Sequence, residues 1–188
     1  MLPLAIGAGW ALLTPPPDLL VTGDGKHLAV RTGDGGLHLL RPRAGDYVRD
    51  QLAEGSGVQA EALDLDAMPG TSCTRDLCLA TLERGGRAWH LLATRSPYFI
   101  DVRQIIAACT WADVAVSDRR LPRPCTPRWL KLDAPALATI GGVAIGFAPI
   151  RIATVRGNDR HPWVVRPPAV RYARPVHPHR LRRWPGGP

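Results

Sequence analysis

The sequence predicts a layered α/β (α+β) domain, in which a mixed β-sheet is flanked by helices. In the first half of the chain, short apolar runs joined by Asp-Gly and Gly-Gly pairs are typical of β-hairpins. In the second half, segments with apolar residues at helical spacing alternate with single strands. The chain has 188 residues, of which 45% are hydrophobic, and this is enough to bury one core.

Residues 2–13 form an uncharged, apolar segment that ends shortly before three prolines at 15–17. As a helix this segment would span about 18 Å, less than the roughly 30 Å of a bilayer core. No basic residues precede it, so it is a poor signal peptide. We expect a core or interfacial segment, or the last part of a membrane helix whose beginning is missing.

The next segment carries a repeat that predicts three strands. The apolar runs 19–21, 28–30 and 37–40 are separated by two copies of Thr-Gly-Asp-Gly, at 22–25 and 32–35. Asp-Gly between short apolar runs favours a tight turn. We therefore expect a three-stranded meander here.

Helices and strands then alternate along the rest of the chain. We expect a helix over 45–54, an irregular loop over 55–70, a hairpin of 78–82 and 88–94 around Gly85 and Gly86, a helix over 102–109 capped by Asp101, a strand over 114–116, a helix capped by Asp133 that runs to Ile140, and two closing strands within 143–157.

Four cysteines, Cys73, Cys78, Cys109 and Cys125, leave two interpretations open. Their spacing does not match a zinc ribbon, which uses Cys-x2-Cys pairs. In an oxidising compartment an even number of cysteines favours disulfides, whereas in the cytosol they would be small core residues. Four cysteines allow three pairings, and the sequence alone does not choose among them.

The positive charge of the chain is concentrated at its C-terminus. Residues 1–150 contain 15 basic and 15 acidic residues, whereas residues 151–188 contain nine arginines and one acid. Such a tail suits a polyanion, either nucleic acid or anionic lipid headgroups. A solvated tail without a partner is the alternative. From residue 161 onward, seven of 28 residues are proline, which favours extended or disordered chain.

Three long strings resemble one family. They are PDLLVTGDGKHLAVRTGDGGLHLLRPRAGDYVRDQ, CTRDLCLATLERGGRAWHLLAT and ADVAVSDRRLPRPCTPRWLKLD. They resemble the C-terminal region of alphaproteobacterial ComEC-type competence proteins, inner-membrane channels that take up transforming DNA as a single strand. The resemblance covers roughly residues 15–165. It implies the end of a transmembrane helix at 1–14, a soluble metallo-β-lactamase-like domain at 15–160 and a flexible Pro/Arg-rich tail at 161–188.

In that family the soluble domain resembles a zinc hydrolase, proposed to degrade the strand that is not imported. Its His-x-His-x-Asp-His cluster and a strand ending in a His pair would hold zinc. Here no such cluster exists, and the strand 112–116 is followed by Ser117, Asp118, Arg119 and Arg120. We therefore expect a degenerate fold without metal or cofactor. We interpret three of the histidines as surface or partly buried residues: His27, His38 and His90.

The resemblance implies a non-catalytic domain of a DNA-uptake channel in the bacterial inner membrane, with this domain on the periplasmic side. Its expected partners are DNA, contacted along the backbone without sequence preference, the membrane and the remainder of the channel. Two alternatives stay open: a nuclease that acts on the non-transported strand, with Asp113 and Asp118 binding magnesium, and a purely structural cap of the channel.

Two sets of residues follow from this hypothesis. Arginine side chains match phosphate oxygens, although Asp118 with Arg119 and Arg120 could instead form a salt-bridged turn. The candidate phosphate-binding residues are Arg119, Arg120, Arg123, Arg128, Arg180, Arg182 and Arg183. The periplasmic location that the resemblance implies favours disulfides, and Cys73–Cys78 and Cys109–Cys125 are the expected pairs because each joins neighbouring segments.

Overall fold

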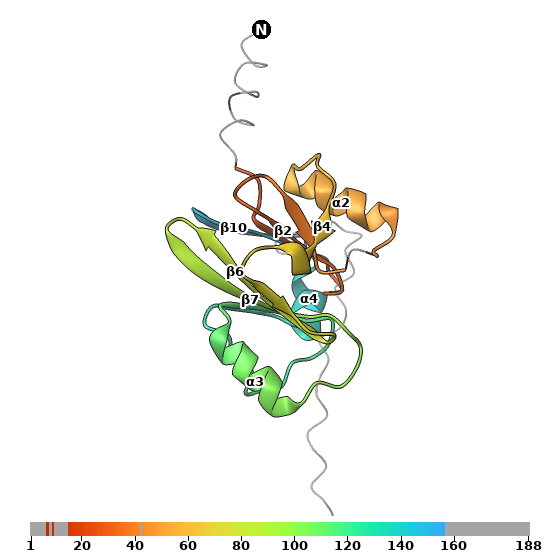
Figure 1. Cartoon of the computed structure of the whole chain (residues 1–188), viewed down its shortest axis with the longest axis vertical. Helices are drawn as coiled ribbons and strands as arrows, with labels where there is room; N and C mark the ends of the chain where they lie inside the picture. The colour runs from red at the N-terminus through yellow and green to blue at the C-terminus, as the bar shows by residue number, and fades with distance from the viewer. Residues whose placement is uncertain (1–6, 8, 10–14, 42, 157–188) are drawn as a thin grey trace, which may run out of the picture. The chain divides into compact units, whose positions relative to one another are not determined.

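Four layers, in the order helix, sheet, sheet and helix, make up the body of the molecule (Figure 1). The structure, a computed structural model, describes residues 7, 9, 15–41 and 43–156. Within these residues the expected α+β class is confirmed, as two mixed sheets rather than one. The expected segments 1–14 and 161–188 lie outside the described residues, apart from Gly7 and Gly9.

The first sheet has six strands in the order β11-β10-β1-β2-β3-β4. Their bounds are Leu19–Val21 for β1, Leu28–Arg31 for β2, Leu37–Leu39 for β3, Leu63–Asp64 for β4, Val143–Phe147 for β10 and Ile150–Thr154 for β11. The central strands β10, β1, β2 and β3 pair antiparallel, which confirms the expected meander.

The second sheet has five strands in the order β5-β6-β7-β8-β9. Their bounds are Thr71–Cys73 for β5, Leu77–Arg84 for β6, Arg87–Thr94 for β7, Val114–Val116 for β8 and Leu130–Leu132 for β9. The expected hairpin is β6–β7, whereas β7, β8 and β9 run parallel. Because parallel strands end at one edge, the segments that follow these three strands meet there.

Helices cover the outer faces of both sheets. In residues 15–156 the α-helices are α2 (Asp46–Ser56), α3 (Val102–Trp111) and α4 (Ala134–Ile140), and η1 (Leu65–Ala67) is a short 3-10 helix. Leu52 of α2 packs against the outer face of the first sheet, and Ile105 of α3 packs against that of the second. Leu137 of α4 belongs to the core between the sheets, so α4 closes one end of that core.

The two Thr-Gly-Asp-Gly copies form similar turns. In the first, Lys26 N–H donates to Asp24 Oδ1 over 3.0 Å, and Gly25 has a φ of 69°. In the second, Gly36 N–H donates to Asp34 Oδ1 over 3.3 Å, and Gly35 has a φ of 87°. The carboxylate of each aspartate thus satisfies the turn backbone, and the following glycine supplies the left-handed conformation.

The two expected aspartate caps have different outcomes. Asp101 caps α3, because its carboxylate accepts from the backbone N–H groups of Arg103 and Gln104 over 2.9 and 3.1 Å. Asp133 makes no such bond to α4, so the expected side-chain cap was wrong. Its buried carboxylate instead accepts from Leu121 N–H over 3.1 Å and thereby ties the loop after β8 to the end of β9.

The loop expected over 55–70 was only partly correct. It contains β4, which adds a short parallel strand beside β3, and η1, which buries Leu65. These elements are too short for periodicity to reveal. In the described part of the chain, no helix combines the length and the apolar character that crossing a membrane requires.

A buried carboxylate, Asp18, joins the two sheets at one end. It accepts from Arg31 of β2 over 3.1 Å, from Arg84 of β6 over 2.8 Å, and from Phe147 N–H of β10 over 2.8 Å. The Arg84 guanidinium also donates to the carbonyl of Arg31. Asp18, which directly precedes β1, therefore accepts hydrogen bonds from residues of three strands, and one of these strands, β6, lies in the second sheet.

We predict that replacing Asp18 with Ala lowers the free energy of unfolding by about 3–5 kcal/mol, because two part-buried guanidiniums lose their partner. Urea unfolding at pH 7 measures this difference. The Asp101→Ala variant is the control and should lose only about 1 kcal/mol, as expected for a helix cap. Equal losses of unfolding free energy in the two variants would contradict a role of Asp18 in linking the two sheets.

Candidate functional site

The segments that follow the parallel strands meet at one edge of the second sheet, where Thr94 ends β7 and Ser117 and Asp118 follow β8. From the first sheet, Arg41 comes shortly after β3 and reaches the same edge. We call Arg41, Thr94, Ser117 and Asp118 the strand-end cluster. In layered α/β proteins, ligands commonly bind beyond such carboxyl ends.

The polar side chains of the strand-end cluster are bonded to one another. Arg41 Nη2 donates to Asp118 Oδ2 over 3.2 Å, with only 24% and 13% of the two side chains exposed. The Thr94 hydroxyl donates to Ser117 Oγ over 3.0 Å, and Ser117 N–H donates to the carbonyl of Leu132 over 2.9 Å. An ion pair and a hydroxyl pair thus occupy this edge of the second sheet.

The turn at Gly25 closes the space next to Ser117. A Cβ atom on Gly25 would lie 2.6 Å from the carbonyl oxygen of Ser117 and 2.8 Å from Leu137 Cδ1. No side chain fits there without moving backbone atoms. The first Thr-Gly-Asp-Gly turn therefore packs directly on the end of β8, and it restricts access to the cluster from that side.

His27 lies just before β2, close to Arg41. Its Nδ1 atom is buried and makes no hydrogen bond to any described residue. Burial lowers the pKa of His27, and the positive charge of Arg41 acts in the same direction, although Asp24 opposes both. The imidazole is therefore neutral at pH 7 and able to accept a bond. A single imidazole beside a guanidinium is not a zinc site, because zinc needs three or four ligands.

A second polar cluster surrounds Asp113 at the opposite end of β8. The Asp113 carboxylate is 1% exposed and accepts from Arg87 over 3.0 Å and from the backbone N–H of His90 over 2.8 Å. Arg128 Nε lies 3.3 Å from the same carboxylate. The His90 ring also contacts Trp111 edge-on, at 4.4 Å between ring centroids. This cluster joins β7, β8 and the end of α3.

The two carboxylates of the magnesium hypothesis do not converge. Asp113 precedes β8 and Asp118 follows it, so about five residues of extended chain, roughly 16 Å, separate them. Each is paired with its own arginines. Among the described residues, these two side chains offer no shared position for a cation.

The predicted phosphate-binding arginines have different surroundings. Arg119 donates to the carbonyls of Ser96 and Tyr98, and Arg128 belongs to the Asp113 cluster. Arg120 and Arg123 are exposed on the loop after β8. The structure thus places Arg119 and Arg128 at opposite ends of β8 rather than in one patch. Three further candidates lie outside the described residues: Arg180, Arg182 and Arg183.

Both expected cysteine pairs are bonded. Cys73 and Cys78 lie opposite each other on β5 and β6, and Cys109 of α3 joins Cys125 in the loop before β9. Among the described residues, the one group of three possible metal ligands consists of Asp66, Cys73 and Cys78. Because its two thiols form a disulfide, this group offers a single carboxylate.

Sequence reasoning found Ser117, Asp118 and the histidines but missed their partners. Arg41 stands 77 positions before Asp118, and no local motif connects them. Arg87 and Asp113 are likewise joined only through the pairing of β7 with β8. The sequence contains one signal for Arg41, which is its position directly after the apolar run 37–40.

We predict that the protein purified without reductant contains no stoichiometric zinc, because neither the strand-end cluster nor the disulfide-linked Asp66 group supplies three ligands. Elemental analysis of the purified chain measures this. The same measurement after reduction is the control, since free thiols at Cys73 and Cys78 could then bind zinc. One zinc per non-reduced chain would contradict the prediction.

We predict that Asp113 makes stability depend on pH in the acidic range. Burial alone would raise the pKa of Asp113, but hydrogen bonds from His90 and the charges of Arg128 and Arg87 hold it below the ordinary value of 3.8. The stabilisation is present above that value and is lost as the pH falls through the lowered pKa. Unfolding free energies of the wild type and of Asp113→Asn between about pH 5 and pH 2 should converge on acidification. Parallel curves would contradict this.

Comparisons with known proteins returned no match. No model of a protein family matches this sequence, and neither a curated protein nor a solved structure matches it.

Proposed function

We propose that this chain is a non-catalytic, metallo-β-lactamase-like domain of a membrane channel for transforming DNA, and that it contacts the DNA backbone. The observation that carries the proposal is the Arg41–Asp118 ion pair at the end of β8. In a hydrolase of that fold, a His pair would stand at this strand end. A guanidinium cannot ligate a metal, and here it pairs with the carboxylate of Asp118.

The layered architecture supports the fold part of the proposal. Two mixed sheets share one core, and helices cover both outer faces, as the resemblance implies for a metallo-β-lactamase-like domain. The disulfides Cys73–Cys78 and Cys109–Cys125 support a location outside the cytosol, since disulfides persist in oxidising compartments such as the periplasm.

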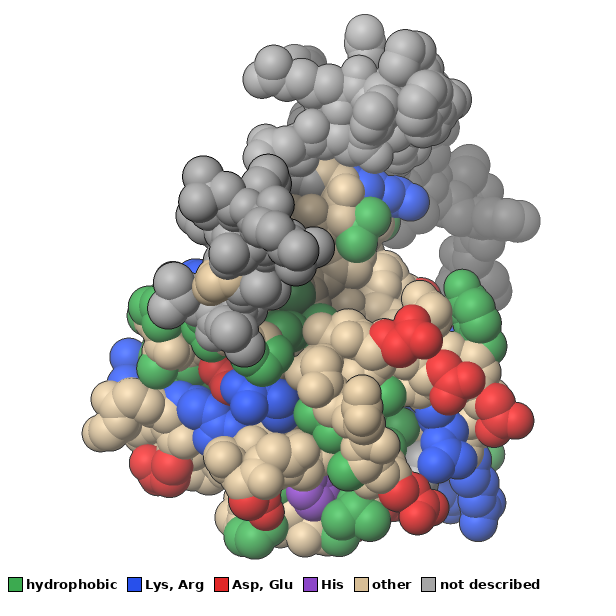
Figure 2. Space-filling view, turned by 90° about the horizontal axis from the view of Figure 1, so that it is seen from above, with side chains coloured by type: hydrophobic (Ala, Val, Ile, Leu, Met, Phe, Trp, Pro, Cys, Tyr) green, Lys and Arg blue, Asp and Glu red, His purple; other side chains and the backbone are tan. Residues whose placement is uncertain are grey.

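The distribution of charge supports contact with a polyanion through the C-terminal segment. On the face shown in Figure 2, acidic and basic side chains are interspersed, as expected from the equal numbers in residues 1–150. Residues 151–188 carry nine arginines and one acid, together with Trp163, Tyr172 and Trp184. Arginine neutralises phosphate charge, and aromatic rings stack on unpaired bases.

We predict that deleting residues 166–188, which removes six arginines, weakens binding of a labelled single strand far more than replacing Arg119 and Arg120 with Ala. The guanidinium of Arg119 is already engaged by two carbonyls. If all six arginines contact phosphates, the slope of log affinity against log salt should fall by about 4. Fluorescence anisotropy at several salt concentrations measures both quantities.

Three results would contradict the proposal, each in a different way. Equal affinity of the full-length and shortened chains would exclude the tail as the DNA contact. Absence of binding to any DNA at low salt would leave the structural cap as the function. Cleavage of duplex DNA in the presence of magnesium, manganese or zinc would favour the nuclease and would place its active site elsewhere than at Asp113 and Asp118.

A further inference from the structure

The loop between β7 and α3 exposes two aromatic rings. Phe99 is 81% exposed and Tyr98 is 57% exposed, and Val102 in the first turn of α3 is 44% exposed. Single apolar residues on a surface are ordinary, but neighbouring rings at the tip of a loop are typical of binding sites. The loop begins directly at the end of β7, so it lies at the same edge as the strand-end cluster.

Hydrogen bonds from both sides hold the loop in place. The Arg119 guanidinium donates to the carbonyls of Ser96 and Tyr98. The Ser96 hydroxyl donates to Asp76, and its oxygen accepts from Tyr98 N–H over 3.2 Å. Asp101 then anchors the end of the loop by capping α3. Because the backbone is already fixed, little conformational entropy remains to be lost when the rings bind a partner.

Arginines accompany the rings. The guanidinium carbon of Arg75 lies 4.7 Å from the centroid of the Tyr98 ring, a cation–π distance. Arg103 is exposed on the first turn of α3, next to Val102. Guanidiniums suit phosphates, and flat rings suit bases, so Arg75 beside the Tyr98 ring offers both kinds of contact to a single strand.

We propose that Tyr98 and Phe99 form a stacking platform for the unpaired bases of single-stranded nucleic acid, with Arg75 and Arg103 near its phosphates. This inference rests on the proposed DNA contact and deepens it, because it names the strand form and the surface. A duplex hides the faces of its bases within the stack. The platform therefore adds affinity for a single strand only, whereas binding by charge alone would be similar for single-stranded and duplex DNA.

Charge on the loop favours nucleic acid over a lipid surface. The Asp101 carboxylate is exposed two positions after Phe99. Insertion of Phe99 among anionic headgroups would carry this carboxylate toward like charge. A nucleic acid also meets this carboxylate, but its uncharged bases can lie over Phe99 while its phosphates pair with arginines such as Arg75 and Arg103.

The test compares three labelled probes on the full chain: an oligo-dT single strand, an abasic strand of the same length and a duplex. The Tyr98→Ala/Phe99→Ala variant should bind oligo-dT about tenfold or more weakly than the wild type, because each stacked base contributes about 1–3 kcal/mol. Its affinity for the abasic strand and for the duplex should stay unchanged. Thermal melting of the variant should match the wild type, since both rings are exposed.

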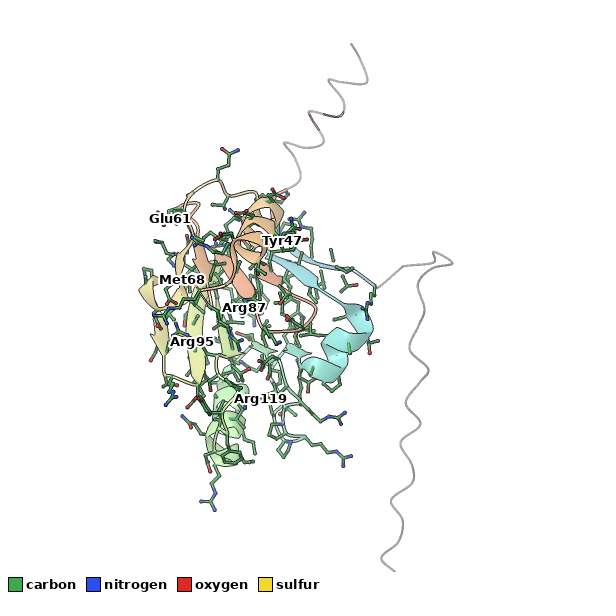
Figure 3. The ribbon with its side chains drawn as sticks, turned by 90° about the vertical axis from the view of Figure 1, so that its right-hand side faces the viewer. Tyr47, Glu61, Met68, Arg87, Arg95 and Arg119 are labelled. Atoms are coloured by element: carbon green, nitrogen blue, oxygen red, sulfur yellow. A yellow bond between two sulfur atoms is a disulfide. The ribbon has the colours of Figure 1, made fainter. Side chains whose placement is uncertain are left out.

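Tyr47→Ala provides the matched control. Tyr47 is an exposed ring on α2, which covers the other sheet, and Figure 3 shows it far from Arg119, whose side chain holds the Tyr98 loop. This variant should bind all three probes like the wild type. An equal loss in Tyr47→Ala would overturn the inference, because it would assign the effect to aromatic surface in general.

The remaining outcomes separate this inference from the proposed function. A double variant that keeps the wild-type ratio of oligo-dT to abasic affinity overturns the platform and leaves DNA binding by charge intact. A wild type that binds none of the three probes overturns the proposed DNA contact itself. A double variant that loses binding to phosphatidylglycerol vesicles but keeps oligo-dT affinity assigns the loop to lipid and overturns the platform.

Discussion

The ion pairs of Asp18 give the packing of the two sheets a directional link at one end of the core. The sheets share a core of apolar side chains, and the hydrophobic effect that buries them is non-directional, so it does not by itself fix the position of one sheet against the other. Asp18 adds direction because it binds Arg31 in its own sheet and Arg84 in the opposite one. Polar contacts between sheets can form only where the apolar core ends.

The strand-end cluster is the counterpart of Asp18 at the other end of the core. Arg41 reaches from the first sheet to Asp118, which follows β8 of the second. The ion pair links segments that are 77 positions apart. Removing either partner would leave a largely buried charge unpaired, which is costly, so the pair helps to hold this edge together.

The sequence predicts local structure well, but it predicts contacts between residues that are distant in the chain poorly. The repeated turns, the β6–β7 hairpin and the cap of α3 follow from short-range chemistry, and all three are present. The division into two sheets could not be predicted, because it depends on which strands pair across long loops. Asp133 illustrates the limit: its position before α4 predicts a cap, but a tertiary contact with Leu121 N–H takes the carboxylate instead. Of the candidate site, the sequence located Asp118 but not Arg41.

The closed cluster and the exposed loop are two consequences of one topology. Because β7, β8 and β9 run parallel, their ends deliver Thr94, Ser117 and Asp133 to a single edge, and the loop that carries Tyr98 starts there. Ligands of layered α/β folds bind beyond such an edge. The polar groups of the strand-end cluster are bonded to one another. A polymer that lies along this edge would therefore contact the side chains that extend farther from the sheet. In this chain those outer groups include the rings of Tyr98 and Phe99 and the guanidinium of Arg75.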